Sequence, residues 1–142
     1  MDFDPSSDYP LGTRRPDLVT TPSGKPLASV TLDALRSGEL TADDLRATPE
    51  TLRRQAAVAQ AAARPQLAQN LARAAELSAV PREVMLEIYT ALRPHRSSSS
   101  ELEAWAERLE HEYGAHLNAT FVREAAGVYA RRGLLAGERA AL

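Results

Sequence analysis

Cysteine is absent from this 142-residue chain, and aromatic residues make up only 5% of it. Without thiols the chain cannot form a disulfide framework, a thiolate zinc site, an iron–sulfur cluster or a cysteine nucleophile. The scarcity of aromatic residues argues against a β-sandwich, whose strands favour aromatic and β-branched side chains. Ala and Leu are abundant and favour helices. The composition therefore predicts a soluble, intracellular, all-α protein.

Strong charge of one sign is also lacking, since 17 basic and 19 acidic residues give a net charge of −2. A chain this close to neutrality has little attraction for nucleic acid or for an anionic membrane surface. The acidic start, with Asp2, Asp4 and Asp8 and no apolar run, excludes a secretory signal. Arg or Glu interrupts every apolar stretch well before the ~20 residues that a membrane helix needs. The sequence therefore predicts neither a nucleic-acid nor a membrane partner.

Residues 1–30 differ from the rest of the chain because they hold five of its nine prolines. Proline lacks the backbone donor and disrupts helix interiors, so we expect this segment to be irregular. Four of its apolar residues would stay in contact with water if the segment were a free tail; they are Tyr9, Leu11, Leu18 and Val19. We therefore predict an extended arm that orders against another surface, with a disordered tail as the alternative.

Residues 31–142 are predicted to form one compact multi-helix domain. Thr31 and Thr41 each look like the N-cap of a short helix, and Gly38 separates the two. Thr48 followed by Pro49 is a strong start signal for a longer helix. Two more prolines predict the starts of the next helices, Pro65 and Pro81, and Pro94 ends the last of these.

Two further helices are expected in the C-terminal part. Ser98 and Glu101 have the spacing of a capping box, and Gly114 is placed to end that helix. The last helix is predicted to begin near Leu117 and to end at a basic pair, residues 131–132, which complements the helix dipole. The residues predicted to face inward along the helices are Leu52, Ala56, Ala59, Ala63, Leu67, Leu71, Ala74, Ala75, Val84, Met85, Ile88, Tyr89, Leu92, Leu102, Trp105, Ala106, Leu109, Tyr113, Phe121, Val122, Ala125, Val128, Tyr129 and Leu135.

The chemistry-bearing residues do not assemble into a site. His111 and His116 are five apart, about 140° around a helix, so they do not share one metal-binding face, and His95 is distant in sequence. The segment Thr21–Lys25 contains Gly-Lys but lacks the remaining features of a phosphate loop, so we interpret it as a turn. Three arginine pairs, at 14–15, 53–54 and 131–132, are too dispersed for a nucleic-acid patch. We predict no catalytic, cofactor-binding or metal residue in this chain.

Several segments nevertheless resemble one family, the small (gamma) subunit of adenosylcobalamin-dependent diol and glycerol dehydratases. The resemblance extends over about residues 8–136 in matching order and spacing. The segments that carry it are Asp8–Leu11, Thr48–Arg53, Arg73–Leu77, Ala79–Pro81, Leu86–Pro94 with Arg96 and Ser97, and Phe121–Ala126.

The resemblance implies a carbon–oxygen lyase that converts propanediol or glycerol to an aldehyde plus water by a radical mechanism. It implies a heterohexamer with a large subunit, built as a (β/α)₈ barrel, and a medium subunit. Adenosylcobalamin would be bound by these partner subunits, and this chain would stabilise their assembly without supplying a catalytic side chain. It would have no activity alone.

Two alternatives remain open at this point. Composition alone favours a helical adaptor or regulatory module without a role in catalysis. Within the family, some small subunits carry a longer N-terminal extension linked to bacterial microcompartments, whereas here only seven residues precede Asp8. We therefore expect a cytoplasmic enzyme, for which microcompartment association is possible but not favoured.

Overall fold

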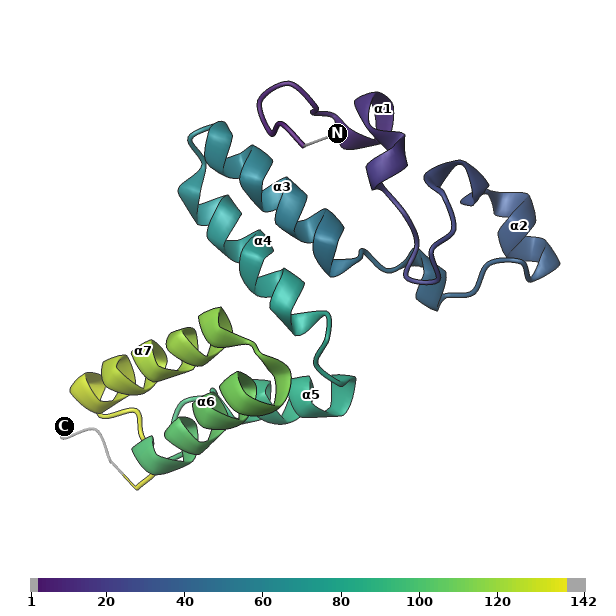
Figure 1. Cartoon of the computed structure of the whole chain (residues 1–142). Helices are drawn as coiled ribbons and strands as arrows, with labels where there is room; N and C mark the ends of the chain where they lie inside the picture. Colours follow the sequence, from purple (N-terminus) through teal and green to yellow (C-terminus); the bar gives the residue numbers. More distant parts are fainter. Residues whose placement is uncertain (1–2, 138–142) are drawn as a thin grey trace. The chain divides into compact units, whose positions relative to one another are not determined.

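The computed structural model describes residues 3–137, and its secondary-structure elements are α-helices and short 3₁₀ turns (Figure 1). The prediction of an all-α fold is confirmed for this part of the chain. The elements in chain order are α1 (Leu11–Arg14), η1 (Pro16–Leu18), η2 (Leu27–Ser29), α2 (Leu32–Ser37), η3 (Asp43–Leu45), α3 (Pro49–Ala61), α4 (Pro65–Leu77), α5 (Arg82–Ala91), α6 (Ser99–Tyr113) and α7 (His116–Arg132), where η marks a 3₁₀ turn.

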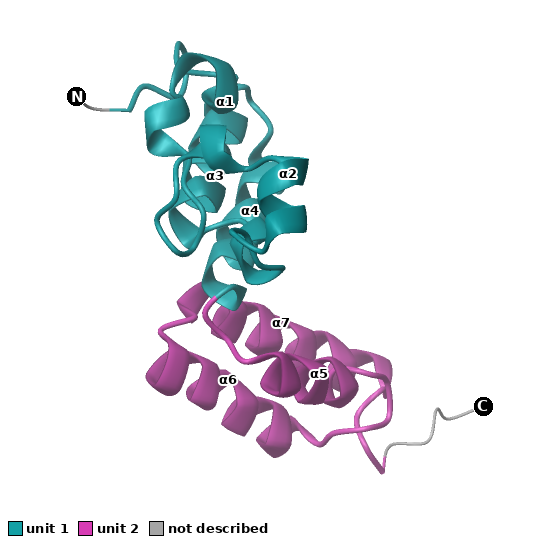
Figure 2. Ribbon diagram, turned by 90° about the vertical axis from the view of Figure 1, so that its right-hand side faces the viewer, with its two compact units in different colours: residues 1–78 teal, residues 79–142 magenta. Residues whose placement is uncertain are grey.

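The chain divides into two compact units, residues 1–78 and residues 79–142 (Figure 2). The first unit holds α1 to α4 and the second holds α5 to α7. The Pro-rich segment is part of the first unit, and the boundary predicted after residue 30 stays a prediction.

Proline starts the short helical turns of the N-terminal segment. Pro10 is the N-cap of α1, Pro16 is the first residue of η1 and Pro26 is the N-cap of η2. Because proline has a fixed φ and no N–H, it fits the first positions of a helical turn while preventing a longer helix upstream. The segment is therefore irregular, as the proline content predicts, but it is built from short turns and is not uniformly extended.

Two of the three predicted threonine caps are present. Thr31 accepts a hydrogen bond from the Ala34 N–H and begins α2, which ends at Gly38 with φ 80°. Thr48 accepts from the Thr51 N–H and begins α3. Thr41 is not a cap, so that prediction is wrong: its N–H donates to the Asp44 carboxylate at 3.0 Å. The Asp44 carboxylate, three residues further along the chain, therefore accepts the backbone N–H of Thr41.

The first unit is centred on the antiparallel hairpin of α3 and α4 (Figure 1). The buried contacts of this pair come largely from small side chains, Ala59 on α3 and Ala68 and Ala75 on α4. Alanine allows two helix backbones to approach closely and also has the highest helix propensity. Leu67, predicted to face inward, is 44% exposed, and Ala63 lies beyond the end of α3 with φ 56°.

The second unit is built on the pair α6 and α7. The predicted capping box is confirmed, with Ser98 accepting from the Glu101 N–H and Glu101 accepting from the Ser98 N–H. Gly114 ends α6 in the left-handed conformation, φ 62°, as predicted. The fully or nearly fully buried residues of this pair are Leu102, Ala106, Leu109, Ala115, Ala119 and Val122.

The helix α5 contributes its Val84 and Ile88 side chains to the core of the second unit. The phenol of Tyr129 on α7 donates a hydrogen bond to the Leu92 carbonyl, directly after α5. Tyr89, predicted to face inward, is 58% exposed, and Phe121 on α7 is 45% exposed. These two predictions are wrong, and the exposed side chains become candidates for contacts outside the unit.

Candidate functional site

The histidines do not gather around a common point. His116 at the start of α7 lies 3.3 Å from Glu110 on α6, measured from Nδ1 to Oε1, whereas His111 is exposed on α6. His95 sits in the loop after α5, where its N–H donates to the Leu134 carbonyl. Within residues 3–137 no group of three or more His, Asp or Glu side chains could hold a metal ion.

A charged cluster joins α6 and α7 near these histidines. Arg123 donates to Glu103 at 2.8 Å and to Glu110 at 3.0 Å. The hydrogen bond from Arg123 lowers the pKa of Glu110, and the contact with His116 lowers it further. These side chains are partly exposed, so the ion pairs add little stability. Their geometry fits a contact that sets the register of two helices.

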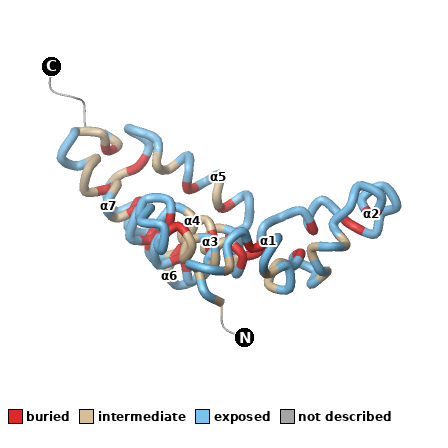
Figure 3. Tube along the Cα trace, turned by 90° about the horizontal axis from the view of Figure 1, so that it is seen from above, coloured by how far each residue is buried: buried red, intermediate tan, exposed pale blue. Residues whose placement is uncertain are grey.

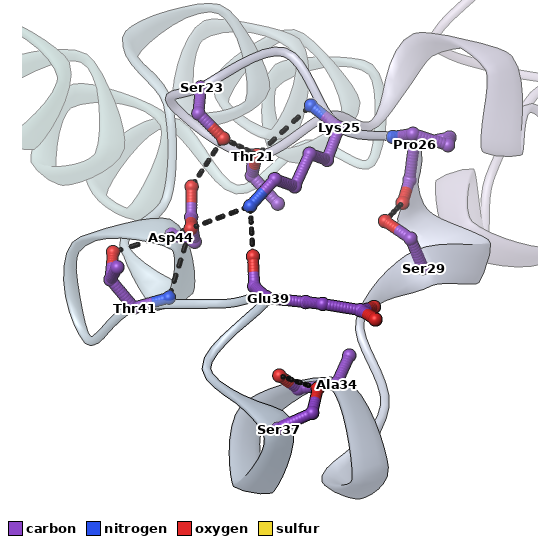
Figure 4. A network of polar contacts seen from close by, with 10 residues as sticks. All are labelled: Thr21, Ser23, Lys25, Pro26, Ser29, Ala34, Ser37, Glu39, Thr41 and Asp44. Carbon is purple, nitrogen blue, oxygen red and sulfur yellow. Dashed lines mark hydrogen bonds and ion pairs between the residues drawn. The ribbon is translucent and has the colours of Figure 1, made fainter.

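A second polar cluster in the first unit is centred on Asp44, a buried carboxylate (Figure 4). Ser23 Oγ donates to one carboxylate oxygen, and Lys25 Nζ lies 3.3 Å from the other. The Thr41 N–H donates to that second oxygen, and Lys25 also donates to the Glu39 carbonyl. The hydrogen bond from Ser23 is the main reason that the pKa of Asp44 lies well below its ordinary value, with Thr41 and Lys25 acting in the same direction.

This Asp44 cluster fixes one loop against another. The predicted turn over Thr21–Lys25 is confirmed, because the Thr21 N–H donates to the Lys25 carbonyl and the Gly24 N–H donates to the Thr21 carbonyl. Both oxygens of Asp44 are occupied by donors of the chain itself, so the carboxylate is not poised as a general base. Ser23 and Asp44 are 21 positions apart, and no local pattern in the sequence pairs them.

Two of the three arginine pairs, at 14–15 and 53–54, make contacts within the first unit. Arg15 forms ion pairs with Asp8 and Asp17, both at 2.9 Å. Arg53 lies 3.5 Å from Glu50, and Arg54 donates to the Leu18 carbonyl, which attaches the N-terminal segment to α3. Because these guanidinium groups have partners within the chain, they do not combine into a phosphate-binding surface.

A hollow of about 510 Å³ lies beside α5 in the second unit. It is lined by Leu86, Glu87, Thr90, Ala91, Arg96, Ser97 and Trp105. The indole of Trp105 is covered on one side by Arg108, whose guanidinium carbon is 5.2 Å from the ring centre. Leu86 is 56% exposed at the edge of this hollow. The mixture of Trp, Arg and exposed apolar side chains is typical of protein–protein contacts.

The short helix α2 presents a second group of exposed apolar side chains. Leu32 is 71% exposed and Leu35 is 39% exposed, and only Ala34 of this helix is buried (Figure 3). Val30 and Leu45, which flank the helix in sequence, are also exposed. A six-residue helix is unstable by itself in water. The exposed leucines therefore make α2 a candidate contact surface.

No helix in the described part of the chain is both long and apolar enough to cross a bilayer. Sequence analysis missed the exposed position of Tyr89 on α5, because Tyr89 shares the apolar pattern of the buried residues. The available signal was that α5 has more apolar residues than one buried stripe along a helix can hold.

The chain matches known proteins over most of its length. Residues 5–136 match the family described as dehydratase small subunit. The propanediol dehydratase small subunit of Salmonella typhimurium is 52% identical over 132 residues, which cover 93% of this chain and 76% of the relative. That of Citrobacter freundii is 51% identical over 132 residues, covering 93% of this chain and 77% of the relative. The chain therefore belongs to the dehydratase small-subunit family.

Proposed function

We propose that this chain is the small, non-catalytic subunit of an adenosylcobalamin-dependent propanediol or glycerol dehydratase. The observation that carries the proposal is the identity of 52% to a propanediol dehydratase small subunit over 93% of the chain. Such an enzyme is a carbon–oxygen lyase that removes water from a 1,2-diol and leaves an aldehyde. The chain assembles with a large barrel-shaped subunit and a medium subunit in a heterohexamer and stabilises their association.

The cofactor belongs to the partner subunits in this proposal. Adenosylcobalamin supplies the adenosyl radical that begins the reaction when it is bound there. The size of the hollow beside α5 supports this assignment, because about 510 Å³ suits a drug-sized ligand and a corrinoid is larger.

In this proposal the chain contributes contact surface to the assembled enzyme. Exposed leucines on α2 and exposed Leu86 and Tyr89 on α5 are positioned to be covered when subunits associate. The cluster around Asp44 fixes one loop against another, and the cluster around Arg123 joins α6 to α7; neither offers a free nucleophile or base. We place the assembled enzyme in the cytoplasm; co-sedimentation with microcompartment shells in cell fractionation would contradict that placement.

Reconstitution tests the proposal. The large and medium subunits encoded with this chain are co-expressed with and without it, and aldehyde formation from 1,2-propanediol is measured with added adenosylcobalamin. We expect cofactor-dependent aldehyde formation from the three-subunit complex and a large loss when this chain is omitted. The isolated chain should give no aldehyde and no saturable spectral change with adenosylcobalamin. Full activity of a complex without this chain, or micromolar cobalamin binding by it, would overturn the proposal.

A further inference from the structure

Two faces of α5 have opposite roles. Val84 and Ile88 are buried in the second unit, whereas Leu86 and Tyr89 are exposed. At about 100° per residue, Leu86 lies roughly 160° around the helix from both buried residues. The outer face of α5 therefore carries exposed Leu86 and Tyr89 beside two exposed charged residues, Arg82 and Glu83.

The outer face of α5 borders the hollow that Trp105 lines. Thr90 lies one helical turn after Leu86, and its hydroxyl donates to the Leu86 carbonyl at 2.8 Å. The Thr90 hydroxyl is therefore satisfied within the helix, and Thr90 lines the hollow together with Leu86. Trp, Tyr and Arg are the residue types that dominate binding energy at protein interfaces, and all three are present here.

Charge around the hollow is unevenly matched. Glu87 lies 3.9 Å from Arg108, and Arg108 also pairs with Glu112 at 2.9 Å. Arg96 lines the hollow as well, but its guanidinium has no ion pair within residues 3–137. The carboxylate in the wall, Glu87, faces Arg108, so Arg96 has no carboxylate partner within the hollow.

We propose that a larger subunit of the dehydratase docks on this surface, placing an apolar side chain in the hollow and a carboxylate against Arg96. The inference rests on the proposed function and adds the place of contact. A small ligand in the hollow would leave Tyr89 in water, which an adjoining protein surface would cover. A second copy of this chain is the competing occupant, because Glu83 on the same face is an exposed carboxylate, and self-association of the chain would reveal it.

The test uses two variants of the docking surface in the three-subunit complex, Leu86→Glu and Arg96→Glu. Both positions are exposed, so far-ultraviolet circular dichroism of each purified variant should match that of the unchanged chain. The matched controls lie in the first unit: Leu67→Glu on α4 and Arg64→Glu just before it, both exposed. Affinity is measured on a biosensor surface that carries the immobilised, tagged complex of large and medium subunits. Self-association is measured by analytical sedimentation.

We expect each docking-surface variant to weaken binding by about tenfold or more, as loss of a central interface residue does. The two controls should bind as the unchanged chain does. Arg96→Lys should retain part of the affinity because it keeps the charge. Unaltered binding of both variants, equal weakening by the controls, or an effect confined to self-association would overturn the docking surface. Failure of the unchanged chain to bind would overturn the proposed function itself.

Discussion

The hydroxyl of Tyr129 donates a hydrogen bond to the backbone carbonyl of Leu92 at 2.5 Å, linking α7 to the residue that follows α5. This bond supplies a donor at the C-terminal end of α5, where carbonyl groups that lack a partner within the helix otherwise bond to water. It also holds the helix that carries Leu86 and Tyr89 against the α6–α7 pair. The position of the proposed docking surface thus depends on a contact inside the second unit.

Removal of that hydroxyl is the first prediction. Tyr129→Phe keeps the ring but leaves the Leu92 carbonyl without its donor, so the free energy of unfolding should fall by about 0.5–1.5 kcal/mol. Urea unfolding followed by circular dichroism measures the change. Tyr89→Phe is the control, because the Tyr89 ring is 58% exposed, and its midpoint should stay where it is. Equal effects of both substitutions would contradict the role given to Tyr129.

Acid stability should depend on Asp44. The pKa of this carboxyl is lowered in the folded chain, chiefly by the Ser23 hydrogen bond, so the unfolded chain binds its proton more readily. The stabilisation is therefore fully present above the ordinary aspartate pKa of about 4 and is lost as the pH falls further. Asp44→Asn should be less stable than the unchanged chain at neutral pH, and the difference should shrink in acid.

Urea midpoints measured across this pH range provide the test. Asp33→Asn is the matched control, since Asp33 is almost fully exposed and its ion pair with Arg36 is at the 4.0 Å limit. The control should leave the midpoints unchanged at every pH. A constant difference between Asp44→Asn and the unchanged chain from neutral pH into acid would show that the titration of Asp44 is not linked to folding.

The capping box of α6 should also contribute measurably. Ser98→Ala removes the hydroxyl that accepts from the Glu101 N–H, and loss of such a cap costs about 0.5–2 kcal/mol. Ser99→Ala is the control, because Ser99 is exposed inside the helix and alanine is favourable there. Thermal unfolding should therefore show a lower midpoint for the first variant only. A drop of the same size for Ser99→Ala would mean that the capping contact is not the cause.

The caps were predictable from the sequence because they act over a few residues. Ser98 and Glu101 are three apart, and Gly114 directly follows the helix that it ends. Leu109 was equally accessible, since three- and four-residue spacing places it with Leu102 and Ala106, and all three are buried. Local physics and helical periodicity were sufficient for these positions.

The remainder depended on tertiary contacts that spacing does not encode. Ser23 reaches Asp44 across 21 positions, and the turn that brings them together is visible only once the loops are folded. Leu67 and Tyr89 fit the apolar pattern of their helices but are exposed. An outward apolar residue can have the same helical spacing as an inward one, so periodicity alone does not separate the two.

Replacement of Leu109 tests the core of the second unit. This side chain is 1% exposed between α6 and α7, so Leu109→Asp loses its packing and also buries a carboxylate without a partner. Together these effects should cost about 3–5 kcal/mol. Leu86→Asp on α5 is the control within the same unit, because Leu86 is 56% exposed. An unchanged thermal midpoint for Leu109→Asp would contradict the buried position.

The last prediction concerns residues 1–30, which we expect to add contact area on a larger subunit. Tyr9 is 60% exposed in this segment, whereas Leu11 is buried and the Leu18 carbonyl accepts a hydrogen bond from Arg54 on α3. Deletion of residues 1–30 should leave most of the helicity intact, because α3 to α7 lie outside it. It should weaken co-purification with the large and medium subunits and reduce aldehyde formation through loss of the complex.

The deletion also removes Ser23 and Lys25, which hold Asp44, so a second variant must separate the two effects. The double substitution Ser23→Ala with Lys25→Ala disables the Asp44 cluster but keeps the segment. If the segment itself contacts a partner, the double variant should lower stability while retaining assembly, and the deletion should lose assembly. Equal loss of assembly in both would trace the effect to the Asp44 cluster, because the contact surface of residues 1–30 is largely preserved in the double variant. Undiminished assembly and activity of the deletion would show that the segment makes no subunit contact that matters.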